Sequence, residues 1–228
     1  MPGPKPRRTD GVRGVVFDLD GTLVDGYQGI TSGVNAARAA FGLPALTVDD
    51  VRGRVGHGLS HLMDDVVGPE RAAAGAEIFR SVYDRVCEVE TRPAPDLAAT
   101  LAALSARGLR MSVASNKPAA YSIRILERLD VRSHFDTIEG PETAGGVKPD
   151  PAMILACLRA MNLRNDQAIY VGDMVLDSEA GRRAGIDVVL VAGGSSSDEA
   201  LRRTGWPVLG ALGDILEVLR SRSGESGS

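Results

Sequence analysis

Long hydrophobic runs are absent from this sequence, in which no apolar stretch approaches the roughly 20 residues that a membrane-spanning helix requires. Cysteine is scarce, and Cys87 and Cys157 form no Cys-x-x-Cys pair, so we expect two buried thiols in a reducing compartment rather than a disulfide. A surplus of positive charge is also missing, because the formal net charge is −4 and no helical stretch carries a basic stripe. These absences argue against membrane and nucleic-acid partners and predict a cytoplasmic protein.

The composition is that of a soluble globular protein, with 43% hydrophobic and 25% charged residues in a chain of 228. That length allows one large domain, or a core domain with a smaller insert. The Pro/Gly-rich residues 1–12 and the Ser/Gly-rich residues 221–228 are predicted to be a disordered lead-in and a disordered tail. No apolar segment follows the basic lead-in, so we do not expect it to be a secretory signal.

Residues 26–91 are predicted to form a small inserted helical domain. Apolar residues recur there every three or four positions, as they do on the buried face of a helix, and no strand pattern interrupts them. The stretches that show this spacing are residues 29–43, 59–68 and 72–90. The links near residues 24–27 and 90–95, the second of which contains two prolines, are expected to act as hinges.

The rest of the chain alternates between buried-strand and helix patterns. The expected strands are "VVF", "LRMSVASN", "FDTIEG", "AIYVGD", "DVVLVAGG" and "PVLGAL". Strands that alternate with helices imply a mostly parallel sheet with helices on both faces. The predicted fold class is therefore α/β: a Rossmann-like, doubly wound parallel sheet core over residues 13–25 and 92–220, with the small helical cap domain inserted into it.

Polar residues follow several of the predicted strands. The stretch "VVFDLDGTLVDG" places Asp18, Asp20 and Asp25 close together directly after an apolar run. In open α/β sheets, ligands bind outside the carboxyl ends of the strands, so polar residues at those ends meet at one edge. The residues expected at this edge are Asp18, Asp20, Ser115, Asn116, Lys148, Asp173 and Asp177.

Four carboxylates in a partly dry cleft repel one another strongly, and a hard divalent cation would offset that repulsion. Mg²⁺ suits such oxygen ligands and keeps room for water and a substrate phosphate in its remaining positions. Lys148 adds a point charge that can hold both a carboxylate and a phosphoryl oxygen. The set therefore predicts a site for a dianion such as a phosphate ester.

The segments "DLDGT", "SN", the lysine of "GGVKPDP" and "GDMVLD", in this order, resemble the four motifs of the haloacid dehalogenase superfamily of phosphotransferases. The insert after the first motif resembles that family's type-one cap, and the loop "VGHGLSHLM" is similar to one in phosphoglycolate phosphatases. The resemblance implies a Mg²⁺-dependent phosphatase that hydrolyses a small phosphomonoester, phosphoglycolate-like, through an aspartyl-phosphate. It implies a small phosphorylated metabolite as partner, and we expect a monomer or a homodimer.

Catalytic roles follow from the same resemblance. Asp18 looks like the nucleophile that attacks phosphorus. Asp20 would protonate the leaving alkoxide and then deprotonate the attacking water. Dehalogenating members and P-type ATPases lack an aspartate at this position, so its presence favours a phosphatase or a mutase. Lys148 would stabilise the charge on Asp18 and on the phosphoryl group.

Binding roles are implied as well. Thr22, Ser115 and Asn116 would contact the phosphate. The implied Mg²⁺ ligands are Asp18, the backbone carbonyl of Asp20, Asp173 and Asp177, the last as a ligand or as a partner of one. Taken without the resemblance, Asp173 and Asp177 could instead be the start of a helix with an aspartate cap.

Three residues of the insert region leave alternatives open. His57, flanked by two glycines, contacts the substrate or only shapes a structural turn. His57 and His61 share a helix face at a spacing of four, but a zinc site would need a third ligand. Asp25 caps the first helix of the insert or lines the entrance, and we leave it out of the catalytic set.

Other functions share some of these motifs. A sugar phosphomutase of the β-phosphoglucomutase type has the same core motifs, and pyrophosphatase activity is a further variant. A catalytically idle binding protein could keep the fold, although every catalytic position is intact here. This chain has Gly26 where the family often has serine, and such departures affect the prediction of the substrate rather than that of the core chemistry.

Overall fold

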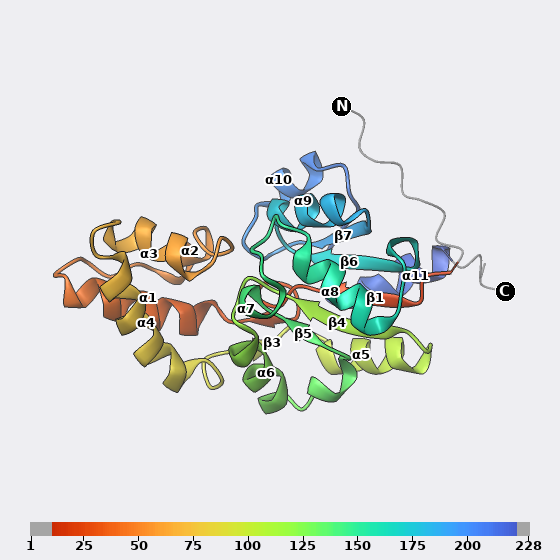
Figure 1. Ribbon diagram of the computed structural model, residues 1–228, viewed down its shortest axis with the longest axis horizontal. Helices are drawn as coiled ribbons and strands as arrows, with labels where there is room; N and C mark the ends of the chain where they lie inside the picture. The colour runs from red at the N-terminus through yellow and green to blue at the C-terminus, as the bar shows by residue number, and fades with distance from the viewer. Residues whose placement is uncertain (1–10, 223–228) are drawn as a thin grey trace.

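Six parallel strands form the central sheet of this protein, in the computed structural model that describes residues 11–222 (Figure 1). The strand order is β5-β4-β1-β6-β7-β8, and every pairing is parallel. The strands are β1 (Gly14–Phe17), β4 (Arg110–Ala114), β5 (Ile138–Glu139), β6 (Ala168–Gly172), β7 (Asp187–Val191) and β8 (Val208–Leu209). The predicted doubly wound parallel sheet is confirmed.

The central strand β1 is buried on both faces, and its sequence explains why. Val15, Val16 and Phe17 are each fully buried, as expected of an apolar run rich in β-branched residues in a parallel sheet. Their side chains alternate between two hydrophobic cores: Val15 and Phe17 belong to one, and Val16 belongs to the other. One short strand therefore organises both layers of the protein.

Helices cover the two faces of the sheet (Figure 1). The core that contains Phe17 also receives residues of α5 (Leu97–Ala106), α6 (Ala119–Arg128) and α11 (Ile215–Arg222). The core that contains Val16 receives residues of α8 (Ala152–Met161), α9 (Val175–Ala184) and α10 (Asp198–Arg203). Shorter elements are α7 (Pro141–Ala144) and the 3₁₀ turns η1 (Arg132–His134), η2 (Asn165–Gln167) and η3 (Leu212–Asp214).

The segment after β1 is helical, and Figure 1 shows its four helices gathered to one side of the sheet. They are α1 (Tyr27–Ala40), α2 (Val48–Arg52), α3 (Leu59–Val67) and α4 (Ala72–Val86). Helix α1 packs along α4, and α3 packs on both, so the apolar spacing of the sequence becomes one shared core. The short helix α2 is the element of this segment that the spacing did not predict.

A second, two-stranded sheet stands where the predicted links enter and leave the helical segment. Strand β2 (Val24–Asp25) pairs antiparallel with β3 (Arg92–Pro93). The division into a core and a cap domain at this point stays a prediction. Of the predicted disordered ends, 1–12 and 221–228, residues 1–10 and 223–228 lie outside the described residues, whereas residues 221 and 222 form the last positions of helix α11. None of the helices between residues 11 and 222 combines the length and the apolar character that crossing a bilayer demands.

Leu101→Ala tests the first hydrophobic core. Leu101 is fully buried in α5, and its replacement should lower the free energy of unfolding by about 2–5 kcal/mol, because a cavity is left beneath the sheet. Urea denaturation followed by circular dichroism measures this. Ala102 is exposed on the same helix, so Ala102→Ser should change the stability by about 0.5 kcal/mol or less. Equal stability of the two variants would contradict the assignment of the core.

Candidate active site

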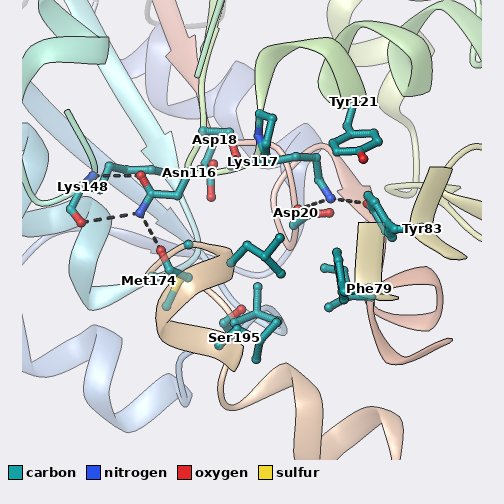
Figure 2. A pocket seen from close by; sticks show the side chains of 18 of the residues that line it. Asp18, Asp20, Phe79, Tyr83, Asn116, Lys117, Tyr121, Lys148, Met174 and Ser195 are labelled. Atoms are coloured by element: carbon teal, nitrogen blue, oxygen red, sulfur yellow. Dashed lines mark hydrogen bonds and ion pairs between the residues drawn. The ribbon is translucent and has the colours of Figure 1, made fainter. Parts of the chain in front are cut away.

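The carboxyl ends of β1, β4 and β6 meet at one edge of the sheet because the three strands are parallel neighbours. A cavity of about 170 Å³ lies between this edge and helices α1–α4 (Figure 2). Its polar lining from the sheet edge comprises Asp18, Asp20, Ser115, Asn116, Lys117 and Lys148, with Ser195 from the loop after β7. Its wall from the helical segment is largely apolar, with Ile30, Val55, Leu59, Leu62, Phe79 and Tyr83, and also includes the cation Arg80 of α4. The polar side chains of the sheet edge therefore face a largely apolar wall across the cavity.

Lys148 is a buried lysine at the centre of this edge, with a side chain only 3% exposed. Its Nζ lies 2.8 Å from Asp18 Oδ1 and 2.8 Å from Asp177 Oδ1, and it donates a hydrogen bond to the hydroxyl of Tyr170 at 2.9 Å. Burial by itself would lower the pKa of Lys148, but the charges of Asp177 and Asp18 outweigh burial and raise that pKa. The lysine therefore stays a cation that joins two carboxylates.

Asp177 has a partner for each carboxylate oxygen. Oδ1 pairs with Lys148 and accepts a hydrogen bond from Tyr170 at 3.0 Å. Oδ2 accepts from the backbone N–H groups of Asp173 at 3.1 Å and of Met174 at 2.9 Å, at the start of α9. Asp177 thus accepts the N–H of Met174, the N-cap residue of α9, from the first turn of that helix, and also belongs to the charged cluster. Its role as a metal ligand stays a prediction.

Asp173 is fully buried and is oriented by side chains from distant segments. Its Oδ1 accepts from the Thr22 hydroxyl at 3.3 Å. Its Oδ2 accepts from the Ser195 N–H at 2.6 Å and from the Tyr27 hydroxyl at 3.4 Å, and Tyr27 in turn lies 2.8 Å from the Ser195 hydroxyl. Thr22, expected at the phosphate, therefore contacts Asp173 in this structure.

The cluster of Asp18, Asp173 and Asp177 fits a divalent cation. One oxygen atom from each of the three lies within 4.8 Å of the others. Burial, Asp177 and Asp18 raise the pKa of Asp173 well above its usual value. Burial raises the pKa of Asp18 to about 6, although Lys148 opposes this and Asp177 adds to it. Three carboxylates beside a single lysine leave two negative charges, which one divalent cation would balance.

Asp20 takes part in a separate pair. Its Oδ2 lies 3.0 Å from the Nζ of Lys117, and both side chains are almost entirely buried. Lys117 also donates a hydrogen bond to the hydroxyl of Tyr83 in α4. Because this pair is neutral overall, the uncompensated charge of the site is confined to the cluster around Lys148.

Ser115 and Asn116 follow β4 and line the cavity, as expected. Asn116 accepts a hydrogen bond from the backbone N–H of Lys148 at 2.8 Å through Oδ1, and its Nδ2 donates to the carbonyl of Gly56 at 2.6 Å. The amide therefore joins the Lys148 loop to the Gly56–Gly58 loop. The hydroxyl of Ser115 accepts from the N–H of Lys117 at 3.4 Å, which shapes the turn after the strand.

The residues with open alternatives are placed as follows. Gly56 and Gly58 line the cavity, but His57 is not among its lining residues, and its ring lies 5.0 Å from that of His61. Asp25 accepts a hydrogen bond from the N–H of Tyr27, the first residue of α1, at 3.2 Å, while the N-cap position of that helix is Gly26. Cys87 and Cys157 are buried free thiols, in agreement with the prediction.

Sequence reasoning missed several polar side chains of the site, among them Tyr27, Tyr83, Lys117, Tyr170 and Ser195. Two of them left a signal. Lys117 directly follows the Ser-Asn pair, and Tyr170 interrupts an otherwise aliphatic strand. Tyr27 and Tyr83 looked like ordinary core positions of helices, and only the packing of those helices shows where their hydroxyl groups lie.

A family model supports these observations. Residues 15–191 match the model described as haloacid dehalogenase-like hydrolase. The chain is similar to the phosphoglycolate phosphatase of Aquifex aeolicus strain VF5, with 34% identity over 183 residues that cover 80% of this chain and 86% of the relative. It is similar to the phosphoglycolate phosphatase of Escherichia coli strain K12, with 31% identity over 233 aligned positions that cover 91% and 92% of the two chains.

Solved structures show the same architecture. A predicted phosphoglycolate phosphatase from Haemophilus somnus 129PT superposes with a TM-score of 0.84 at 25% identity and covers 91% of this chain and 97% of its own. A predicted phosphatase from Clostridium acetobutylicum superposes with a TM-score of 0.84 at 23% identity and covers 92% and 99%. At its lower identity the second similarity supports the fold alone.

Mg²⁺ should stabilise the protein through the carboxylate cluster. A ligand that binds only the folded state adds about 2.7 kcal/mol at about 100 times its dissociation constant, so the Tm in EDTA should rise when excess Mg²⁺ is added. Thermal denaturation followed by circular dichroism measures the shift. Asp173→Asn should remove most of it, whereas Asp25→Asn, at an exposed carboxylate outside the cluster, should retain it. A Tm that ignores Mg²⁺ in the unaltered protein would contradict the cation site.

Proposed function

We propose that this chain, which belongs to the haloacid dehalogenase-like hydrolase family, is a Mg²⁺-dependent phosphatase that hydrolyses small phosphomonoesters through an aspartyl-phosphate. That it is a phosphatase follows from its similarity to phosphoglycolate phosphatases over most of its length. The observation that carries the mechanism is the buried ion pair of Asp18 with Lys148 in the lining of the cavity. It presents a carboxylate nucleophile beside a fixed cation, which an incoming phosphate dianion requires.

Asp18 is the proposed nucleophile. It follows the central strand β1 directly, is almost completely buried, and lines the cavity. One of its oxygens would form a bond to phosphorus while the bond from phosphorus to the ester oxygen breaks. Lys148, 2.8 Å from Asp18, would offset the charge that gathers on the carboxylate and the phosphoryl oxygens as they approach.

Asp20 is the proposed acid and base. It lines the same cavity two residues after Asp18, and would give its proton to the departing alkoxide. The resulting carboxylate would then take a proton from the water that attacks phosphorus in the aspartyl-phosphate. Hydrolysis of that intermediate returns Asp18 and releases inorganic phosphate.

Phosphate binding is assigned to the loop after β4 together with Lys148. Ser115 offers its hydroxyl at the cavity. Asn116 holds the backbone of Lys148, and so its proposed contribution to phosphate binding includes placing that lysine. For Thr22 and His57 the proposed contact with the substrate rests on the resemblance of their motifs to those of the family.

The proposed holders of Mg²⁺ are the carboxylates of Asp18 and Asp173 and the backbone carbonyl of Asp20, with Asp177 as a ligand or as their partner. When bound, Mg²⁺ would neutralise part of the phosphoryl charge and orient the phosphoryl group. The protein's own residues supply the rest: Thr22, Tyr27 and Ser195 fix the orientation of Asp173 by hydrogen bonds.

Asp18→Asn should abolish phosphatase activity while the fold is kept. The amide is a poor nucleophile, so we expect hydrolysis of p-nitrophenyl phosphate to fall by about 10³-fold or more. Release of p-nitrophenol measures the rate, and circular dichroism checks the fold. Asp25→Asn, which changes a nearby carboxylate outside the cavity, should stay within a few-fold of the unaltered enzyme. Substantial activity in the Asp18 variant would refute its role as the nucleophile.

A substrate panel should favour small phosphomonoesters. The cavity is small, and among the side chains that line its helical wall Arg80 is a cation that a substrate carboxylate could meet. Sugar hydroxyl groups buried against the apolar part of that wall without partners would lose their hydrogen bonds with water. We therefore expect a higher kcat/KM for phosphoglycolate and other compact phosphomonoesters than for sugar phosphates and pyrophosphate, with inorganic phosphate as the product. Conversion of a sugar 1-phosphate into its 6-phosphate without phosphate release would instead indicate a mutase.

A further inference from the structure

Lys117 is a buried lysine to which the proposed mechanism gives no task. Its side chain is 6% exposed, and its Nζ lies 3.0 Å from Oδ2 of Asp20. A buried ammonium group is strongly destabilising unless it is paired. Here the pairing partner is the residue that would transfer the protons. Lys117 lies on the wall of the cavity beside Asp20, and Figure 2 shows the two side chains joined on the side nearer to Tyr83.

Tyr83 holds Lys117 from the opposite side. Its hydroxyl accepts a hydrogen bond from the Nζ of Lys117, which also lies 4.6 Å from the centre of the Tyr83 ring. The ring itself is fixed, because it stacks on Phe79 at 5.1 Å and meets the edge of Tyr121 at 5.0 Å. Lys117 therefore has little freedom to leave Asp20, and its anchor belongs to helix α4 rather than to the sheet.

Asp20 depends on this one cation for its orientation. Between residues 11 and 222, Lys117 is the only side chain paired with its carboxylate. Oδ1 of Asp20 is buried without a hydrogen-bond partner and lies against Gly26, where an added Cβ would collide with it. One oxygen is thus held and the other is unpartnered, which leaves the carboxylate dependent on Lys117 for its position.

We propose that Lys117 is a positioning residue that orients Asp20 for proton transfer, and that Tyr83 of helix α4 holds Lys117 in place for this task. The inference rests on the proposed function of Asp20. Asp20 enters the first step as a protonated carboxyl group whose Oδ2 still accepts a hydrogen bond from Lys117. Its proton passes to the ester oxygen as the bond from that oxygen to phosphorus breaks and the bond from Asp18 to phosphorus forms. In the second step a proton of the attacking water passes to Asp20. Lys117 keeps its protons throughout.

The dependence on the leaving group separates this role from a structural one. A strongly basic alkoxide leaves only when it is protonated, whereas p-nitrophenolate leaves without much help from an acid. A misplaced Asp20 should therefore slow the cleavage of benzyl phosphate far more than that of p-nitrophenyl phosphate. A general loss of packing or of phosphate binding would slow both to the same degree. The ratio kcat/KM reports the steps up to release of the alcohol, and so excludes the later hydrolysis of the aspartyl-phosphate.

The experiment measures kcat/KM for p-nitrophenyl, phenyl and benzyl phosphate with saturating Mg²⁺. For Lys117→Met we expect a loss of about 10–10²-fold on benzyl phosphate and of less than about 3-fold on p-nitrophenyl phosphate. Tyr83→Phe keeps the ring and removes the hydroxyl, so its loss should follow the same order of substrates at a smaller size. This variant also carries the test if Lys117→Met fails to fold, which thermal denaturation would reveal.

Arg124 supplies a matched control. It is a second cation, from α6, that contacts helix α4, because it lies 3.4 Å from Asp84 of that helix and 2.6 Å from Glu88 just after the helix ends. It has no contact with Asp20. Arg124→Met should therefore leave the order of the three substrates unchanged. Asp20→Asn is the positive control and should show the steepest dependence on the leaving group.

The outcomes distinguish the positioning role of Lys117 from the acid–base role of Asp20. Equal losses on all three substrates in Lys117→Met, or the same leaving-group dependence in Arg124→Met, would overturn the positioning role of Lys117. If Asp20→Asn shows no leaving-group dependence, then the proposed acid itself is wrong, and the inference fails with it. A steep dependence in Asp20→Asn and Lys117→Met, together with a flat one in Arg124→Met, supports both.

Discussion

The buried lysine at position 148 is the interaction on which the architecture of the site depends. It holds Asp18, at the end of the central strand, and Asp177, at the start of α9, each at 2.8 Å. Without that cation, the carboxyl ends of β1 and β6 would face each other with like charges in a region that excludes water. Asn116 fixes the backbone of the same lysine, so the loop after β4 is joined to the cluster too. The segments that follow β1, β4 and β6 thus meet at one lysine, two at its ammonium group and one at its backbone N–H.

A second lysine divides the site into two electrostatic parts. Around Lys148, three carboxylates exceed the available positive charge, and a divalent cation would offset this excess so that a phosphate dianion could approach. Around Lys117, one carboxylate meets one cation and the balance is even. The excess negative charge belongs to the cluster that contains the proposed nucleophile. The neutral pair of Asp20 and Lys117 lies beside the cavity wall that helix α4 provides. The proposed attack on phosphorus and the proposed proton transfer therefore take place in different electrostatic environments.

Much of the fold could be predicted because periodicity reports burial directly. Fully apolar runs such as Val15–Phe17 indicate strands buried on both faces, and the spacing of Ile30, Val34 and Ala37 indicates a helix with one buried face. The short elements escaped prediction, since α2 and α7 contain too few residues for a period to show. The aspartate cap that the sequence offered as an alternative to the metal site is not the N-cap of α9, which is Met174; Asp177 instead accepts the N–H of Met174 from the first turn of the helix.

By itself, the sequence determined which residues stand at the carboxyl ends of the strands, because strand order in a parallel sheet brings every such end to one edge. The sequence alone therefore predicted that one edge of the sheet would carry Asp18, Asp173, Asp177 and Lys148. Only the tertiary structure decided how the charges pair: that Lys148 lies between Asp18 and Asp177, and that Lys117 takes Asp20 and is held by Tyr83. The physical reason is the separation along the chain of the residues that interact. Burial leaves a local pattern in the sequence, whereas an ion pair between residues about a hundred positions apart depends on the packing of whole helices and leaves none.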